Sequence, residues 1–236
     1  MRAFFDKLYK GKEEELYTLL EDRLVNKQKT FIVTANPEVY MALKDHVAIC
    51  QKMFTDETII TPDGEGIVYA AKKLGYTING KIAGVDTVAR LLKIGDAHQA
   101  DVYFFGSKDY VLAALKKKIE TVYPHLNIVG CQHGYIENRE AVMQDILAKQ
   151  PDLIFIALGV PAQEEEIAAH IDAFQKGIFV GCGGSLDVLS GTKARAPHFL
   201  VRMKLEWVYR IVKEPKRLKR FLKSNLKFLA EIRRIQ

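Results

Sequence analysis

An aspartate that follows an apolar run is the residue of this chain best placed to do chemistry. Asp63 comes after the run TIIT and a proline, and it precedes a glycine in TPDGEG (61–66). A carboxylate held at a rigid strand end can act as a general base when a substrate hydroxyl reaches it. Asp is also a preferred helix N-cap residue, and helix formers begin at Gly64, so capping is the simpler interpretation from position alone.

Glycine and small polar residues follow the other apolar runs in the same way. The turns are TANPE (34–38), GSK (106–108), QHGY (132–135), GVPAQE (159–164) and GGSLD (183–187). Such residues at a helix entrance let a phosphate approach backbone N–H groups, although ordinary turns use the same residue types. Among the six histidines, His133 stands out because it lies in a glycine-containing turn at a strand end, whereas the histidines as a set show no metal-ligand spacing.

Several signatures are missing, and their absence excludes classes of protein. Neither GxGxxG nor GxxxxGK[ST] occurs, which argues against NAD-type and P-loop binding, and no serine lies in a GxSxG elbow. The three cysteines are far apart and odd in number, so a disulfide framework is not expected. The richest apolar run, LIFIALGV (153–160), is much shorter than the roughly twenty residues of a membrane span. We therefore expect a chain of the cytosol.

An alternation of strands and helices must position these turns. Apolar β-branched runs predict strands at 30–34, 58–61, 101–105, 126–130, 153–157 and 178–181. Helical patterns lie between them at 37–50, 64–74, 86–94, 108–121, 138–149 and 162–174. Several strands are apolar throughout, as expected when helices cover both faces of a parallel sheet. The pattern predicts a Rossmann-like, doubly wound α/β fold with a mostly parallel sheet, in which ligands bind beyond the carboxyl ends of the strands.

The last 42 residues differ from the rest in charge and in pattern. Residues 195–236 hold 13 Lys/Arg and 3 Asp/Glu, whereas residues 1–194 hold 22 and 26, so the excess positive charge lies in the tail. Helix formers predominate there, with a break at Glu214–Pro215 and apolar residues every three or four positions after it. The pattern is typical of a membrane-surface helix, or of a helix packed on its own domain with a solvated basic face. We predict an α/β domain at 1–194, with helices at its N-terminus, and a basic helical appendage at 195–236.

Eight short segments form an ordered set between about residues 25 and 225. They are TANPE (34–38), TPDGEG (61–66), AGVD (83–86), FFGS (104–107), GCQHGY (130–135), LGVPAQE (158–164), GCGGSLDVLSGTKARAP (181–197) and EWVYR (206–210). Each is weak alone, but eight in order are specific. Together they resemble the WecG/TagA/CpsF family of bacterial glycosyltransferases.

The resemblance implies an activity. It implies an inverting transferase that moves N-acetylmannosamine from UDP-N-acetylmannosamine to undecaprenyl-diphosphate-linked GlcNAc, in the teichoic acid linkage unit of the cell wall. Members of the family that use glucose or a mannosamine uronic acid for capsule or exopolysaccharide synthesis are the alternative. Outside the family, a nucleotide-dependent oxidoreductase fails on the missing GxGxxG. A nucleic-acid-binding module fails because the tail aromatics fit helix-core spacing better than a stacking platform, so no nucleic acid partner is expected.

The resemblance also implies roles for individual residues. Asp63 matches the proposed catalytic base, and Thr34, Asn36 and Gln163 match pocket-lining positions, of which we place Thr34 and Asn36 with the base. The tail arginines thought to reach the diphosphates are matched by Arg210, Arg217 and Arg220. Lys81 stands where the family usually has arginine, which keeps the charge but loses the bidentate fork. We further expect Gly106, His133 and Gly134 to contact substrate.

Location and partners follow from the lipid-linked acceptor. Because that acceptor stays in the bilayer, the resemblance implies a peripheral enzyme at the cytoplasmic face of the membrane, held to anionic lipid by its basic tail. No DxD motif accompanies the loops, so neither a cofactor nor a metal is expected, and the UDP-sugar is a substrate. The sequence leaves a homo-oligomer open.

Overall fold

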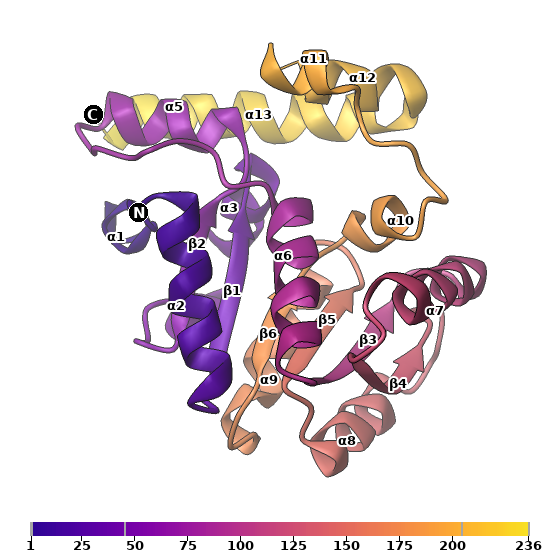
Figure 1. The fold of residues 1–236 in the computed structure, drawn as a ribbon. Helices are drawn as coiled ribbons and strands as arrows, with labels where there is room; N and C mark the ends of the chain where they lie inside the picture. The colour runs from indigo at the N-terminus through magenta and orange to yellow at the C-terminus, as the bar shows by residue number, and fades with distance from the viewer. Residues whose placement is uncertain (1, 45, 204, 236) are drawn as a thin grey trace.

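A six-stranded sheet with helices on both faces forms the body of the molecule (Figure 1). The computed structural model describes residues 2–44, 46–203 and 205–235. The strands are β1 (Thr30–Ala35), β2 (Thr58–Pro62), β3 (Asp101–Gly106), β4 (Asn127–Gln132), β5 (Leu153–Ala157) and β6 (Ile178–Gly181). Their order is β2-β1-β6-β5-β3-β4, and every neighbouring pair is parallel. The predicted doubly wound α/β class is confirmed.

Helices connect the strands and precede them. The helices α1 and α2 precede the sheet, further helices connect the strands, and α11, α12 and α13 belong to the tail. The bounds are α1 (Arg2–Lys7), α2 (Glu13–Val25), α3 (Pro37–Lys44), α4 (Val47–Met53), α5 (Glu65–Lys73), α6 (Gly84–Ala97), α7 (Asp109–Val122), α8 (Arg139–Lys149), α9 (Ala162–His170), α10 (Ser185–Leu189), α11 (His198–Arg202), α12 (Glu206–Lys213) and α13 (Lys216–Ile235). The prediction of a single helix at 37–50 is wrong. Two helices replace it, because His46 has an extended backbone (φ −122°, ψ 92°) at the N-cap of α4.

Alternating strand side chains build an apolar layer on each face of the sheet. On β3, Tyr103 and Phe105 point into one layer, and Val102 and Phe104 point into the other. The first layer also takes residues from α1, α3, α4, α5, α8 and α9, and the second takes residues from α2, α6, α7 and α10. Both faces of the central strands are thus buried, which is why these strands are mostly apolar and polar chemistry is concentrated at their ends, whereas the edge strand β4 is partly exposed.

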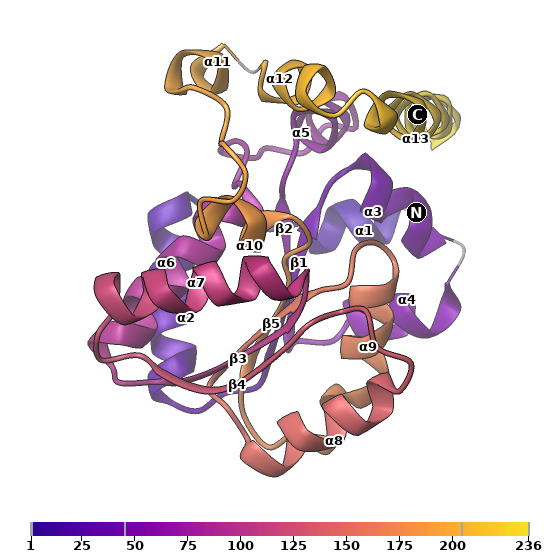
Figure 2. The same ribbon diagram turned by 90° about the vertical axis from the view of Figure 1, so that its right-hand side faces the viewer.

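The tail lies across one end of the molecule. Figure 2 shows α11, α12 and α13 as a layer beyond the carboxyl ends of β1 and β2. Phe228 and Ile232 of α13 are each 1% exposed and belong to the first apolar layer, and the Phe228 ring lies 5.0 Å from the Tyr40 ring. An ion pair of 2.9 Å joins Lys44 to Glu231. The C-terminal half of α13 is therefore anchored on the α/β body, and the division at residue 194 stays a prediction.

A second face of α13 is exposed to solvent. Leu218, Leu222 and Leu226 are 41, 46 and 64% exposed, and the helix begins at Lys216, directly after the predicted break. Within the described residues, no helix combines the length and the apolar character needed to cross a membrane.

Candidate active site

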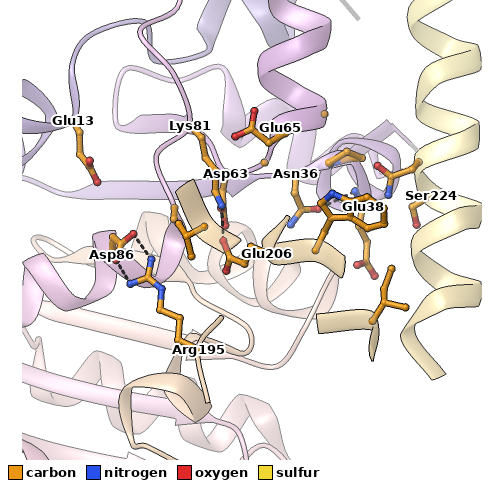
Figure 3. Close-up of a pocket in the computed structure, with 18 residues that line it drawn as sticks. Glu13, Asn36, Glu38, Asp63, Glu65, Lys81, Asp86, Arg195, Glu206 and Ser224 are labelled. Carbon is orange, nitrogen blue, oxygen red and sulfur yellow. Dashed lines mark hydrogen bonds and ion pairs between the residues drawn. The ribbon is translucent and has the colours of Figure 1, made fainter. Parts of the chain in front are cut away.

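Two adjoining cavities, of about 430 and 650 Å³, lie where the carboxyl ends of β1 and β2 meet the tail. We call the first the α13-side cavity, since Ser224 and Asn225 of α13 line it, and the second the α9-side cavity, since Gln163 of α9 lines it. Six residues line both: Asn36, Glu38, Asp63, Ala83, Arg195 and Glu206. The two cavities therefore share a wall, and Asp63 is part of it (Figure 3).

Asp63 is held at the junction of two strands and a helix. Its backbone N–H donates to the carbonyl oxygen of Ala35 at 2.8 Å, which ties the end of β2 to the end of β1. A Cβ on Gly84, the first residue of α6, would lie 3.0 Å from Oδ2 of Asp63 and 3.1 Å from Cγ2 of Thr34. The N-cap of α5 is Gly64, so Asp63 does not occupy the capping position that was the simpler interpretation. Asp63 lines both cavities.

Thr34 and Asn36 flank Asp63, and each also has a structural bond. Thr34 is buried at the end of β1, and its hydroxyl donates to the carbonyl oxygen of Gly181 at 3.1 Å. The Oδ1 of Asn36 accepts from the N–H groups of Glu38 at 2.9 Å and Val39 at 3.0 Å, which caps α3. A ligand therefore meets the Asn36 amide through its nitrogen, as a hydrogen-bond donor. The structure brings Thr34, Asn36, Asp63 and Gln163 together around the α9-side cavity.

In the α13-side cavity, two ion pairs join the α/β body to the tail (Figure 3). Nζ of Lys81 lies 2.7 Å from Oε2 of Glu206, with the two side chains 23 and 8% exposed. Arg195 binds Asp86 through two bonds of 2.6 Å, and these bonds hold the pKa of Arg195 above its usual value. The sequence predicted Lys81 as a site residue, but Asp86, Arg195 and Glu206 were not predicted to belong to the site. The signal was present, because all three lie in the segments AGVD, GTKARAP and EWVYR.

Three predicted substrate contacts lie elsewhere. Gly106, His133 and Gly134 line neither cavity and lie at the ends of β3 and β4, beside the α9-side cavity, since a Cβ on Gly134 would lie 2.9 Å from Cδ2 of Leu158, which lines it. The N–H of Gly134 donates to Ser107 at 3.0 Å, and Nδ1 of His133 accepts from the N–H of Tyr135 at 3.1 Å. A Cβ on Gly106 would lie 2.4 Å from the backbone of Ala157, so only glycine fits there. Their contact with substrate stays a prediction.

The three tail arginines belong to helices whose backbones are described. Arg210 lies on α12, and Arg217 and Arg220 lie on α13. The side chains of all three are outside the described residues, so their expected reach toward diphosphates stays a prediction.

The sequence model described as "Glycosyl transferase WecG/TagA/CpsF family" matches residues 5–236. The chain belongs to this family. A protein of Bacillus spizizenii is 36% identical over 204 residues, which are 86% of this chain and 79% of that protein. A Bacillus subtilis protein is 35% identical over 81% of this chain and 74% of its own length, and a Staphylococcus aureus protein is 33% identical over 93 and 85%. All three are named N-acetylglucosaminyldiphosphoundecaprenol N-acetyl-beta-D-mannosaminyltransferase.

The charges around this glycosyltransferase site are unevenly distributed. Carboxylates outnumber cations in the α13-side cavity, because its charged lining consists of Glu13, Glu38, Asp63, Glu65, Asp86 and Glu206 against Lys81 and Arg195. Both cations are paired with carboxylates. No group of three or more His, Cys, Asp or Glu side chains among the described residues is arranged to hold a metal ion. A diphosphate that binds Lys81 or Arg195 in the α13-side cavity has to share or displace these ion pairs.

Proposed function

We propose that this chain transfers N-acetylmannosamine from UDP-N-acetylmannosamine to GlcNAc-diphosphoundecaprenol, with inversion at the sugar carbon. Three relatives at 33 to 36% identity carry the name of that transferase, and the matches cover most of each chain. The observation that carries the mechanism is the position of Asp63 on the wall shared by two cavities. A donor in one cavity and an acceptor in the other would meet at this carboxylate.

The chemistry assigned to Asp63 balances as a direct displacement. The acceptor hydroxyl gives its proton to the Asp63 carboxylate while its oxygen attacks the anomeric carbon of the donor sugar. The bond from that carbon to the diphosphate oxygen breaks, and UDP leaves with the electron pair. Lys81 and Arg195 line the α13-side cavity, and Lys193, Arg195 and Lys213 line the α9-side cavity, so described cations in either cavity could stabilise the departing diphosphate.

The tail supplies a surface suited to a lipid-linked acceptor. Exposed apolar side chains concentrate there, at Phe199, Met203, Trp207, Val212, Leu218, Leu222, Leu226 and Leu229. The same segment holds 13 Lys/Arg, and each basic residue near an anionic leaflet contributes about 1 kcal/mol to binding. We therefore place the chain peripherally on the inner face of the cell membrane. We also place its product in the teichoic acid linkage unit.

A donor screen tests this proposal. The full chain is incubated with a short-chain lipid-diphosphate-GlcNAc and with UDP-N-acetylmannosamine, UDP-glucose or the UDP-linked mannosamine uronic acid, and released UDP is measured. We expect turnover with UDP-N-acetylmannosamine and little with the others. Preferred turnover with either of the other donors would replace the proposed donor but keep the family activity. No transfer from any of the three would contradict the proposal.

A further inference from the structure

A buried pair of polar side chains in the first turn of α9 carries an inference beyond the proposed reaction. Gln163 and Glu164 are 2 and 1% exposed, although both are polar. Gln163 lines the α9-side cavity, whereas Glu164 lines neither cavity and has no place in the transfer step. A carboxyl group in such a position is costly to ionise, so its presence calls for a physical reason.

The amide of Gln163 is fixed at both ends. Its Nε2 donates to Oε1 of Glu164 at 2.8 Å, and its Oε1 accepts from the backbone N–H of Gly183 at 3.0 Å. Exchanging the oxygen and the nitrogen of this amide would place two acceptors against each other on one side and two donors on the other. The two bonds therefore select one of the two amide orientations.

Close packing holds the pair against β6. A Cβ on Gly181 would lie 2.8 Å from Nε2 of Gln163 and 3.1 Å from Oε1 of Glu164, so the glycine makes room for both groups. The Gly181 carbonyl oxygen also accepts the Thr34 hydroxyl at 3.1 Å. The end of β6 thus links Thr34, which is beside Asp63, to the fixed amide.

Glu164 itself is incompletely satisfied. Its Oε2 is buried and has no hydrogen-bond partner. Burial, with a smaller contribution from the negative charges of Glu165 on the same helix and Glu38 on α3, raises the pKa of Glu164 to about 7, although the hydrogen bonds from Gln163 and from the backbone oppose the rise. The Cys182 thiol after β6 adds no charge, because burial raises its pKa well above neutrality. An apolar side chain would fill this space at lower cost, so an acceptor at this position is better explained by what it does to Gln163 than by stability.

We propose that Glu164 is a positioning residue that fixes the Gln163 amide so that it presents one N–H and one carbonyl lone pair to a sugar hydroxyl in the α9-side cavity. A primary amide has two N–H donors and two lone pairs, and the protein uses one of each. The remaining pair matches a hydroxyl, which both accepts and donates. The assignment of this hydroxyl to a sugar rests on the proposed function, whereas the fixed orientation of the Gln163 amide does not depend on it.

The first test needs no substrate. In ¹H–¹⁵N spectra of the full chain, the side-chain amide signals of Gln163 are identified as those that disappear in Gln163→Leu. We expect its signals to move between pH 5.5 and 8.5 with a midpoint near 7, and this response to vanish in both Glu164→Gln and Glu164→Leu. Glu165→Gln is the matched control, because Glu165 lies on the same helix and pairs with His46 at 3.0 Å. Gln163 signals that are the same in wild type and in Glu164→Leu would overturn the proposal.

The second test uses transfer kinetics with UDP-N-acetylmannosamine. We expect Gln163→Leu and Glu164→Leu each to lower kcat/KM by about 10- to 100-fold. The first variant removes the hydrogen bonds from the amide to the sugar hydroxyl, and the second leaves the amide without the acceptor that orients it. The double variant should lose no more than either single variant, and Glu164→Gln should recover most of the loss, since its amide oxygen still accepts from Gln163. A loss of kcat/KM in the double variant equal to the product of the two single losses would contradict the positioning role. A wild-type protein without transfer activity whose Gln163 signals behave as expected would refute the proposed function and leave the fixed amide standing.

Discussion

The ammonium of Lys81 lies 2.7 Å from the carboxylate of Glu206, although 125 positions separate the two residues along the chain. Lys81 belongs to the segment before α6, and Glu206 is the first residue of α12. Because the Glu206 side chain is only 8% exposed, little water screens its charge from Lys81. The cation expected to meet a substrate phosphate is therefore already neutralised by the tail, and the donor has to compete with an internal carboxylate.

Removing that competitor gives the first prediction. Glu206→Gln keeps the shape of the side chain but takes away its charge, so UDP should bind about 3- to 10-fold more tightly in calorimetry. The double variant Glu206→Gln with Lys81→Met should lose the gain, because the cation is then absent. Unchanged UDP affinity in Glu206→Gln would mean that Lys81 does not meet the diphosphate.

The second prediction concerns the type of cation at position 81. Lys81→Arg restores a bidentate fork and should hold or improve affinity for the UDP-sugar, whereas Lys81→Ala should weaken it. Affinities are compared by titration at one ionic strength, because exposed charges are screened by salt. Equal affinity in all three proteins would place this side chain outside the donor site.

The third prediction isolates the proposed base. Asp63→Asn keeps the size of the side chain but cannot accept the acceptor proton, so kcat should fall by about 10²- to 10⁴-fold while UDP affinity changes little. Released UDP gives the turnover and calorimetry gives the affinity. Turnover close to that of the wild type would return Asp63 to a purely structural role.

The fourth prediction separates the buried and the exposed face of α13. Phe228→Ala removes a ring that is 1% exposed and should lower the free energy of unfolding by about 3 kcal/mol or more. Leu226→Ser, on the same helix but 64% exposed, should change it by less than about 0.5 kcal/mol. Urea unfolding measures both.

The same leucine variant tests membrane attachment. Leu226→Ser combined with Leu222→Ser should weaken sedimentation with vesicles containing phosphatidylglycerol, because apolar contact with the leaflet is lost while every basic residue is kept. Vesicle binding equal to that of the wild type would show that the exposed face of α13 does not touch lipid.

The fifth prediction follows from the raised pKa of Glu164. The folded chain keeps this proton between pH 4.5 and about 7, where the unfolded chain has lost it, so the free energy of unfolding falls as pH rises through that window. At about 1.4 kcal/mol per pKa unit the fall is roughly 3 kcal/mol. Urea unfolding at pH 5 and pH 8 should show this slope in wild type, a slightly shallower one in Glu165→Gln, whose lost charge makes the smaller contribution to the shift, and the shallowest one in Glu164→Gln. Equal slopes in all three proteins would contradict it.

Much of the fold could be predicted because each signal is local. The β5 bounds, Leu153–Ala157, match the predicted range, and its apolar residues alternate between two buried layers. Asp63 and Gln163 could be placed at one edge because the carboxyl ends of parallel strands meet there. The break between α3 and α4 was missed, since the apolar spacing continues through His46 while its backbone turns extended.

The ion pairs of the site could not be predicted in the same way. Asp86 and Arg195 are 109 positions apart, and no periodicity relates them. Their contact depends on how the tail folds back over the ends of β1 and β2, which is a tertiary property. The loops that hold Gly106 and His133 have the same composition as the loops of the cavities, so sequence alone did not separate the two sets of loops.

The divided walls of the α13-side cavity have a consequence for inhibitor discovery. One wall comes from residues 13–86 and the other from residues 195–225, so the space exists only while the two parts of the chain are together. A fragment of residues 1–194 would present only one wall of this cavity, as an open surface. Screening against that fragment would select molecules for a surface that the whole chain covers, whereas a compound that wedges between Trp207 and the sheet would be found only with the tail present.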